Sequence, residues 1–254
     1  MARKPELGKY LLYRLFSQHK EIRRHLPATA RYTPAVLAAF LRRYRVVFVK
    51  PSGGSRGQGI LKVWRDGGKV HVQHTVHSRR TFRSVEAAVR HVERIRDPKA
   101  YVVQQGIPLF QVGGRPVDIR VMVQRERPGG PWLYTGMVAK VAGKDSVVTN
   151  VALSRGRVME VEAALRQGLG WSPQQVQRCV TRLRELALEA ARHFDSYQMY
   201  RELGFDFGID TKGRIWLIEE NTGPSHLMKL LKNRPDIGRL MDRRWALYQR
   251  ALRR

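Results

Sequence analysis

The chain has 254 residues, 43% of them hydrophobic, so it can bury a sizeable core and is too apolar to be disordered. Lysine and arginine number 48 against 21 acidic residues, and the formal net charge of +27 predicts attraction to polyanions. The basic residues are spread along the whole chain instead of being gathered in one tail. The charge alone therefore does not define a nucleic-acid surface.

Cysteine content and apolar patterning exclude two further classes of protein. Cys179 is the single cysteine, which excludes an internal disulfide, and we expect it to be a buried, inert thiol in a helix. No apolar run is long enough for a signal peptide or for the roughly 20 residues of a membrane helix. These features predict a soluble, cytoplasmic chain.

The first hundred residues predict short helices followed by strands. Apolar residues at helical intervals over Leu7–Leu26 indicate one or two short helices that end at Pro27. Thr33 and Pro34 predict the cap and first turn of a helix that continues to about Arg43. The other elements expected here are a helix capped by Ser84 that runs to Arg96 and strands at Val46–Lys50, Ile60–Val63, Lys69–His77 and Tyr101–Gln104.

The rest of the chain adds hairpins and two long helices. Ser172 and Pro173 predict the start of a helix that continues to about Tyr197, and Leu227–Arg254 has a basic helical pattern. The expected strands are Val117–Gln124, Trp132–Val141, Phe205–Asp210 and Arg214–Glu219. Hairpins interspersed with helices favour an α+β fold with mainly antiparallel sheets over a regularly alternating parallel one.

A loop with four glycines, PSGGSRGQGI at residues 51–60, connects two of the expected strands. Glycine lets backbone amides approach an anion closely, so such a turn often holds phosphate. The loop leads into a strand instead of a helix, which excludes the Walker and dinucleotide-binding motifs. Taken alone, the segment is compatible with a flexible hairpin over a nucleotide and with a simple mobile hairpin tip.

Acidic residues gather in a second segment, GFDFGIDTKGRIWLIEENTGPS at residues 204–225. Asp206 lies on one expected strand, and Glu219 and Asn221 lie at the end of the next, so a hairpin through the TKG turn brings the three side chains together. Oxygen ligands of this kind suit Mg²⁺. A merely solvated acidic hairpin end is the less favoured alternative in a chain this basic.

Together the two segments resemble the ATP-grasp superfamily, in which two α+β lobes grip ATP and magnesium. A series of motifs is more specifically similar to the YheC/YheD family of endospore coat-associated ATP-grasp proteins: Lys9-Tyr10, LPAT, KPSGGSRGQGI, DIRVMVQ, GFDFGID and EENTGPSH. The resemblance covers nearly the whole chain. It implies a helical lead-in at residues 1–45, a small lobe at 46–105 with the glycine-rich loop, and a large lobe at 106–254 with the metal site.

The resemblance assigns ATP contacts to several residues. Lys9 and Lys50 match the two ATP lysines, with Lys50 on the α and β phosphates, and Asp118 falls at the ribose position. The loop residues expected to fold over the triphosphate are Ser55, Arg56 and Gly57. The hinge whose backbone meets the adenine is expected at Gln104, Gln105 and Ile107, although many relatives have an acidic residue where Gln104 stands.

The same resemblance assigns catalytic and metal-binding roles. Arg120 is expected to face the phosphates or the acyl substrate, Lys140 to neutralise phosphate, and Asn150 to lie near metal and substrate. The magnesium ligands implied are Asp206, Glu219 and Asn221. In one departure, ligases with this metal set often carry arginine two residues before the aspartate, where this chain has Gly204. Another basic residue must stabilise the reacting phosphate, or catalysis is weak.

The function implied is an ATP- and Mg²⁺-dependent carboxylate–amine ligase that forms an amide or peptide bond through an acyl phosphate, with a link to sporulation and the spore coat. Its partners would be a carboxylate and an amine substrate, among them a peptide or an acidic polymer, and spore-coat proteins. One alternative is a non-catalytic coat or assembly protein that binds nucleotide or polyanion; another is kinase-like phosphoryl transfer. Nucleic acid is a less favoured partner that the charge leaves open.

The segment HVQHTVH contains His71, His74 and His77 at spacings that invite a metal site. In the strand expected at Lys69–His77, alternation places His74 on the opposite face from the other two histidines. Three ligands then do not converge, and we expect no zinc site.

Overall fold

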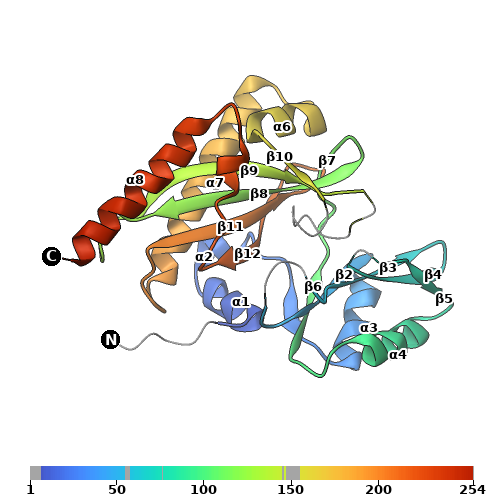
Figure 1. The fold of residues 1–254 in the computed structure, drawn as a ribbon. Helices are drawn as coiled ribbons and strands as arrows, with labels where there is room; N and C mark the ends of the chain where they lie inside the picture. Colours follow the sequence, from blue (N-terminus) through green and yellow to red (C-terminus); the bar gives the residue numbers. More distant parts are fainter. Residues whose placement is uncertain (1–6, 55–57, 76, 145, 147–154, 254) are drawn as a thin grey trace.

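The computed structural model describes residues 7–54, 58–75, 77–144, 146 and 155–253. Two antiparallel sheets, each covered by helices, form two lobes (Figure 1). This arrangement confirms the predicted α+β class. The helix caps predicted at Thr33, Ser84 and Ser172 are also present, because each hydroxyl accepts a hydrogen bond from the backbone N–H three residues further on.

The small lobe is built on a six-stranded sheet. In spatial order its strands are β1 (Thr29–Arg31), β6 (Tyr101–Gln105), β2 (Val46–Pro51), β3 (Leu61–Asp66), β4 (Lys69–His74) and β5 (Arg80–Phe82). Helices α3 (Pro34–Arg43) and α4 (Val85–Ile95) cover one face and bury alternate valines of β2 and β3 in a core of their own. The residues between those valines face the other lobe.

The large lobe contains the second sheet. Its strands in spatial order are β10 (Arg157–Met159), β9 (Leu133–Val141), β8 (Arg115–Gln124), β11 (Glu202–Ile209) and β12 (Ile215–Asn221), and β7 (Gln111–Val112) pairs with β8. Helices α6 (Val161–Leu169) and α7 (Pro173–Phe194) pack on one face. A short 3₁₀ helix, η1 (Leu227–Leu230), and α8 (Pro235–Leu252) pack on part of the other face against Met122 and Val138. The remainder of that second face is turned toward the small lobe (Figure 1).

Two N-terminal helices, α1 (Lys9–Ser17) and α2 (Lys20–Arg23), pack on the large lobe. The ring of Phe16 lies 6.0 Å from Phe194 and 6.4 Å from Phe205, centroid to centroid. By contrast, β1 and α3 belong to the sheet and core of the small lobe. The described part of the predicted lead-in, residues 7–45, is therefore divided between the two lobes, and the domain limits given above stay a prediction.

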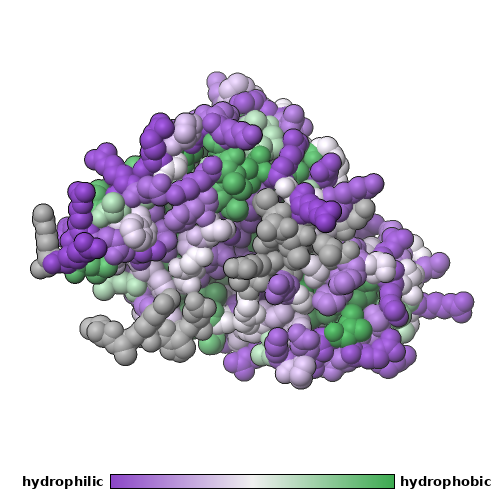
Figure 2. Space-filling view, viewed as in Figure 1, coloured by the Kyte–Doolittle hydropathy of each residue, from purple (hydrophilic) through white to green (hydrophobic). Residues whose placement is uncertain are grey.

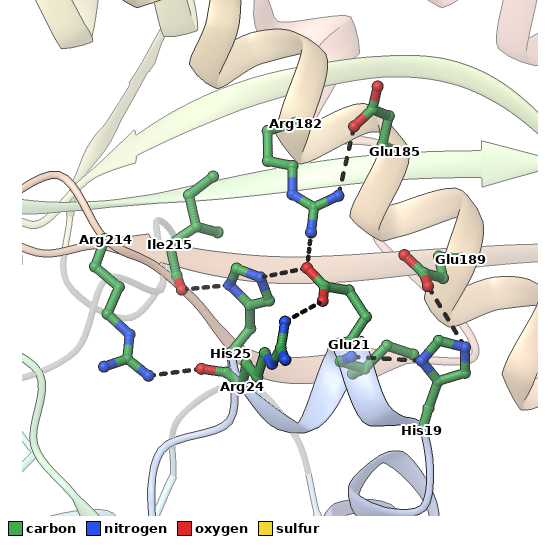
Figure 3. A network of polar contacts seen from close by, with 10 residues as sticks. His19, Glu21, Arg24, His25, Arg182, Glu185, Glu189, Arg214 and Ile215 are labelled. Atoms are coloured by element: carbon green, nitrogen blue, oxygen red, sulfur yellow. Dashed lines mark hydrogen bonds and ion pairs between the residues drawn. The ribbon is translucent and has the colours of Figure 1, made fainter.

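Polar contacts hold α2 and the residues around it against α7 and β12 (Figure 3). Glu21 forms an ion pair with Arg182 of α7, and His19 Nε2 lies 3.4 Å from Glu189 Oε1. His25 Nδ1 hydrogen-bonds the Ile215 carbonyl oxygen at 2.8 Å, which connects this segment to the start of β12. The network fixes α1 and α2 beside the hairpin that carries Asp206 and Glu219.

The predicted separation of His74 from His77 is wrong. Strand β4 ends at His74, and Thr75 has a positive φ of 52°, so the chain turns instead of continuing to alternate. The His77 N–H donates to the His74 carbonyl oxygen at 2.9 Å, and the two imidazole rings come within 5.4 Å of each other. The histidines therefore meet at a turn.

The surface agrees with the composition of the chain. Most residues on the face drawn in Figure 2 are hydrophilic, as the excess of arginine and lysine predicts. Of the helices in the described part of the chain, none has the length and apolar character needed to cross a bilayer.

Candidate nucleotide-binding site

A cavity of about 430 Å³ lies between the two sheets. The small lobe contributes Val46, Phe48, Lys50, Ile60, Lys62, Gln104 and Gln105 to its lining, and the large lobe contributes Asp118, Arg120, Lys140, Asp206, Ile218, Glu219 and Asn221. Its volume is in the range of small-molecule sites. The position between lobes and the mixture of apolar and charged walls make it the candidate functional site.

Strand register explains how the small lobe presents its side chains. Phe48 and Lys50 are two residues apart on β2 and therefore point to the same face. Phe48 lies opposite Lys62 of β3 on one side and Gln104 of β6 on the other. The row of three strands thus places an aromatic ring among polar side chains on the wall of the cavity.

Part of the cavity wall is apolar. Its side chains come from both lobes and from the segment that follows β6, and they are Val46, Phe48, Ile60, Ile107, Leu109 and Ile218. Apolar walls with a few polar groups at the edge suit a flat aromatic ring such as a nucleobase. The charged end of the same cavity is suited to phosphates.

Lys50 is a buried cation on the small-lobe wall of the cavity. Its Nζ donates to Gln104 Oε1 at 2.6 Å, and Gln104 Nε2 in turn donates to Thr29 Oγ1 at 3.1 Å. Burial lowers the pKa of Lys50 to about 8, against the opposing effect of the Glu219 carboxylate. An anion placed beside this buried ammonium would favour its charged form.

The charged end contains a cluster of ion pairs on β8, β9 and β11. Arg120 Nε and Nη2 donate to the two carboxylate oxygens of Asp206 at 2.6 and 3.0 Å. Lys140 Nζ lies 3.0 Å from Asp206 Oδ1 and 3.1 Å from Asp118 Oδ1. These four residues are between 4% and 5% exposed, so their charges depend on one another for compensation.

The protonation states in this cluster follow from that pairing. Burial would raise the pKa of Asp206, but Arg120 and Lys140 hold it well below its usual value. Burial would lower the pKa of Lys140, but Asp118 and Asp206 raise it. Arg120 Nη1 is buried and has no hydrogen-bond partner within the described structure, so the ion pairs of the cluster do not use every donor of this guanidinium.

Glu219 and Asn221 lie on β12 beside Asp206. Glu219 is directly opposite Asp206 in the β11–β12 register, and Asn221 Nδ2 lies 3.5 Å from Asp206 Oδ2. Lys9, at the start of α1, places its Nζ 3.2 Å from Glu219 Oε1 and donates to the Gly54 carbonyl oxygen at 3.0 Å. Lys9 therefore contacts both the glycine-rich loop and the acidic strand.

The donor set fits Mg²⁺ bound together with phosphate. Within the described residues, no three His, Cys, Asp or Glu side chains are arranged to hold a metal by themselves. Mg²⁺ commonly uses one or two carboxylates plus substrate phosphates, which matches Asp206 and Glu219 with the Asn221 amide oxygen. The two carboxylates already form ion pairs with basic side chains, namely Arg120 and Lys140 at Asp206 and Lys9 at Glu219. Their negative charge is thus placed where it stabilises a neighbouring positive charge.

The structure brings most of the predicted site residues to one cavity. Those that line it are Lys50, Gln104, Gln105, Ile107, Asp118, Arg120, Lys140, Asp206, Glu219 and Asn221, and Lys9 lies at its edge against Glu219. Four predicted residues, Ser55, Arg56, Gly57 and Asn150, are outside the described residues. Their roles stay predictions.

Sequence reasoning missed several residues of the cavity wall, among them Phe48 and Lys62. Phe48 is two residues from Lys50 on β2, and Lys62 lies opposite Phe48 on β3, so the alternation in the two strands could have found them. Lys62 Nζ lies 4.9 Å from the centre of the Trp64 ring, and burial lowers its pKa. It adds a second small-lobe cation to the cavity.

Gly204 has a packing reason that the sequence did not reveal. A Cβ atom at this position would lie 2.7 Å from Pro224 Cβ, 3.1 Å from Arg120 Cδ and 3.2 Å from Arg120 Nη1. Real Cβ atoms essentially never approach another heavy atom as closely as the first of these distances, and the Arg120 side chain fills the space that a larger residue 204 would need. Arg120 is thus the basic residue beside the position where related ligases often have arginine.

The single cysteine lies away from this chemistry. Cys179 is buried in α7, and burial raises the pKa of its thiol to about 12. The prediction of a buried thiol is confirmed, and the cavity has no cysteine nucleophile among its described lining residues.

Two α+β lobes that enclose a half-apolar, half-charged cavity are the architecture of an ATP-grasp domain. The chain belongs to the YheC/D-like ATP-grasp family, which it matches over residues 2–252. It is also 30% identical over 210 residues to "Endospore coat-associated protein YheD" of Bacillus subtilis (strain 168). That similarity covers 79% of this chain but only 44% of the relative, so the chain spans less than half of the relative's length.

Proposed function

We propose that this chain is an ATP- and Mg²⁺-dependent carboxylate–amine ligase that forms an amide or peptide bond through an acyl phosphate. The ion-pair cluster of Arg120, Asp206 and Lys140 at the charged end of the cavity carries this proposal. A buried cluster of this kind is costly to maintain, and it places cations where a phosphoryl group gains negative charge during transfer. The name of the relative supports a link with the spore coat.

Each residue of the cavity has a role in the proposed reaction. The apolar part of the wall holds the base, and Lys50 and Lys140 offset charge on the phosphates. Arg120 lies at the charged end of the cavity and stabilises the negative charge that develops on the reacting phosphoryl group. Bound Mg²⁺ would be held by Asp206, Glu219 and Asn221 and would offset phosphate charge. The carboxylate attacks the γ-phosphorus and ADP leaves, which gives an acyl phosphate. The amine then attacks the acyl carbon, phosphate leaves and the nitrogen loses a proton to solvent, so positioning and electrostatics suffice without a protein nucleophile.

The nucleotide and metal assignments are tested by thermal unfolding with and without Mg-ATP. The wild-type protein should be stabilised by about 2.7 kcal/mol at a ligand concentration about 100 times Kd, because the ligand binds only the folded state. Glu219→Gln should lose the magnesium-dependent part of this shift. Glu185→Gln removes the same charge from an exposed position on α7 and should retain it. An unchanged shift in Glu219→Gln would sink the metal assignment.

Product analysis separates the ligase from its alternatives. ADP release that requires both a carboxylate and an amine, with formation of an amide, is expected of a ligase. A phosphorylated product without an amide would indicate kinase-like transfer. Binding of polyglutamate or DNA that disappears at moderate salt, with no nucleotide turnover, would instead support the non-catalytic assembly protein that the +27 charge suggests.

The affinity for ATP should fall as the pH rises from 7 to 9. The pKa of Lys50 is about 8 in the ligand-free protein, so its charged fraction falls about tenfold over this interval. Binding a triphosphate requires the charged form, and the expected loss of affinity is therefore also about tenfold. Calorimetric titration at several pH values measures it, with proton uptake on binding near pH 8.

Two controls isolate Lys50 in this titration. Adenosine has no phosphate, so its affinity should show no such pH dependence. Lys50→Met removes the titrating group and should weaken ATP much more than adenosine. If both ligands weakened equally in Lys50→Met, Lys50 would not be a phosphate contact.

A further inference from the structure

A second cavity lies on the opposite face of the small-lobe sheet, between β4, β5 and α4. Its volume is about 540 Å³, and it shares no lining residue with the nucleotide cavity. Alternation along β4 explains the separation, because Val72 and His74 point to the side of α4 whereas Gln73 points to the side of Lys62. The buried side chain of Val72 and the half-buried Ile95 form its apolar part.

The polar lining of this cavity is cationic or neutral throughout. It consists of His74, His77, Ser78, Arg80, His91 and Arg94. The described lining residues include no carboxylate. We call this set the histidine–arginine pocket.

The turn at Thr75 gives the pocket its shape. Because the chain reverses there, His77 faces His74, with 5.4 Å between ring centroids. From the other side, α4 contributes His91, which is only 6% exposed and lies 4.9 Å from the Phe82 ring. Arg94 Nη2 donates to His91 Nδ1 at 3.0 Å, so this imidazole is held as the neutral form that carries its hydrogen on Nε2.

The electrostatics of the pocket are those of a site for negative charge. Burial lowers the pKa of His91, and Arg94 and Arg80 lower it further. The pKa of His74 is lowered by burial and then by His77, whereas Asp97 acts to raise it. The neighbouring guanidiniums and imidazole thus disfavour protonation of these histidines, and an anion in the pocket would offset that repulsion. A metal cation would meet the same repulsion, so cation binding is disfavoured.

We propose that the histidine–arginine pocket binds a small molecule or side chain that carries phosphate or carboxylate groups, at a site separate from the ATP site. Arg80 and Arg94 would donate to the oxyanion, and His74 and His77 would add N–H donors when protonated. The cavity is larger than a single phosphate ion needs, and its apolar part would accommodate the carbon skeleton of the ligand.

Binding should strengthen as the pH falls from 8 to 6, because the anion stabilises protonated imidazoles and a proton is taken up. The groups that face the histidines are Arg80 on β5, Arg94 on α4, Ser78 in the turn and Asp97 beyond α4. Among these groups only Asp97 is acidic, and it favours the protonated form of His74 even without a bound anion. A ligand held by the nucleotide cavity alone would leave these histidines unaffected.

Nuclear magnetic resonance of the histidine side chains tests the proposal in the full chain. Pyrophosphate and citrate are the two probes, and Lys50→Met is the background that suppresses binding at the nucleotide cavity. The resonances of His74, His77 and His91 should shift in a saturable way with at least one probe. A response to pyrophosphate alone would identify a phosphate ligand, and a response to citrate alone a carboxylate ligand.

The double variant Arg80→Gln/Arg94→Gln should bind the preferred probe at least about tenfold more weakly, since each charge-assisted hydrogen bond lost contributes roughly that factor. Arg243→Gln/Arg253→Gln removes the same charge from exposed positions in and just after α8 and should leave the affinity within about twofold. The proposal is overturned if neither probe shifts the three histidines, or if the Arg243/Arg253 variant weakens binding as much as the pocket variant.

Discussion

Replacing Arg120 by alanine should lower the rate of ADP release by about 10²- to 10³-fold, as the loss of one strong donor to a developing charge typically does. Arg120 forms a bidentate pair with Asp206 and keeps Nη1 unpaired beside Gly204. The variant should also lose about 3 kcal/mol of folding stability, because a buried carboxylate loses part of its compensation. The rate of ADP release with the carboxylate–amine pair that supports it, together with urea unfolding, measures the two effects.

Arg125→Ala is the matched control for this variant. Arg125 follows β8, is as deeply buried as Arg120, and pairs with Asp195 while it stacks on the Trp132 ring at 4.1 Å. It does not line the nucleotide cavity. Its removal should cost comparable stability but leave the turnover of the folded protein nearly unchanged. Equal losses of turnover in the two variants would mean that Arg120 only supports the fold.

The site could be predicted from the sequence to the extent that local patterns determine it. The TKG turn was sufficient to predict a hairpin that brings Asp206 close to Glu219, and the register confirms that the two residues are paired. Regular pairing from the turn would have put Ile218 opposite Asp206, and a register shift between Asp206 and Phe207, which the sequence did not reveal, puts Glu219 there instead. The same reasoning located the hairpin of β2 and β3 around the glycine-rich loop. These features depend on neighbours close in sequence, which is why one chain reveals them.

Features that depend on distant contacts could not be predicted in this way. Strands β1, β5, β7 and β10 are two or three residues long, and their pairing with distant strands or neighbours leaves no periodic signal. The docking of α1 and α2 on α7 rests on contacts such as that of Phe16 with Phe194, which are far apart in the sequence. The link from Lys50 through Gln104 to Thr29 likewise joins three separate strands.

Charge pairing at the site illustrates the same limit. The sequence indicated acidic metal ligands and basic phosphate ligands as two sets, but the structure pairs them with each other through Arg120, Lys140 and Lys9. When phosphate or Mg²⁺ binds to such a cluster, it replaces some of these ion pairs, and the side chains that it contacts are already ordered. Contacts within the protein therefore order these side chains, and the cost of ordering them falls on folding instead of binding.

Gly204→Ala should destabilise the protein by about 1 to 3 kcal/mol, the usual cost of adding a methyl group to a packed region, which corresponds to a fall of several degrees in Tm. The added Cβ would meet Pro224 Cβ at 2.7 Å and Arg120 Cδ at 3.1 Å, on a strand whose neighbours are fixed by register. Turnover should fall as well, because the contact displaces Arg120 from Asp206. Calorimetric unfolding and ADP release measure the two changes.

The control for this steric argument is Gly223→Ala. Gly223 precedes Pro224 in the same loop, has no heavy atom within 4 Å of the place that an added methyl group would take, and has no positive φ, so its replacement should be nearly neutral. In the background of Pro224→Gly, the cost of Gly204→Ala should become smaller, since one of the two colliding atoms is absent. If Gly204→Ala were neutral and active, residue 204 would have room for a side chain. The glycine at position 204 would then not be explained by the packing of Arg120. Arg120 could no longer be taken as the substitute for the arginine that related ligases often have at this position.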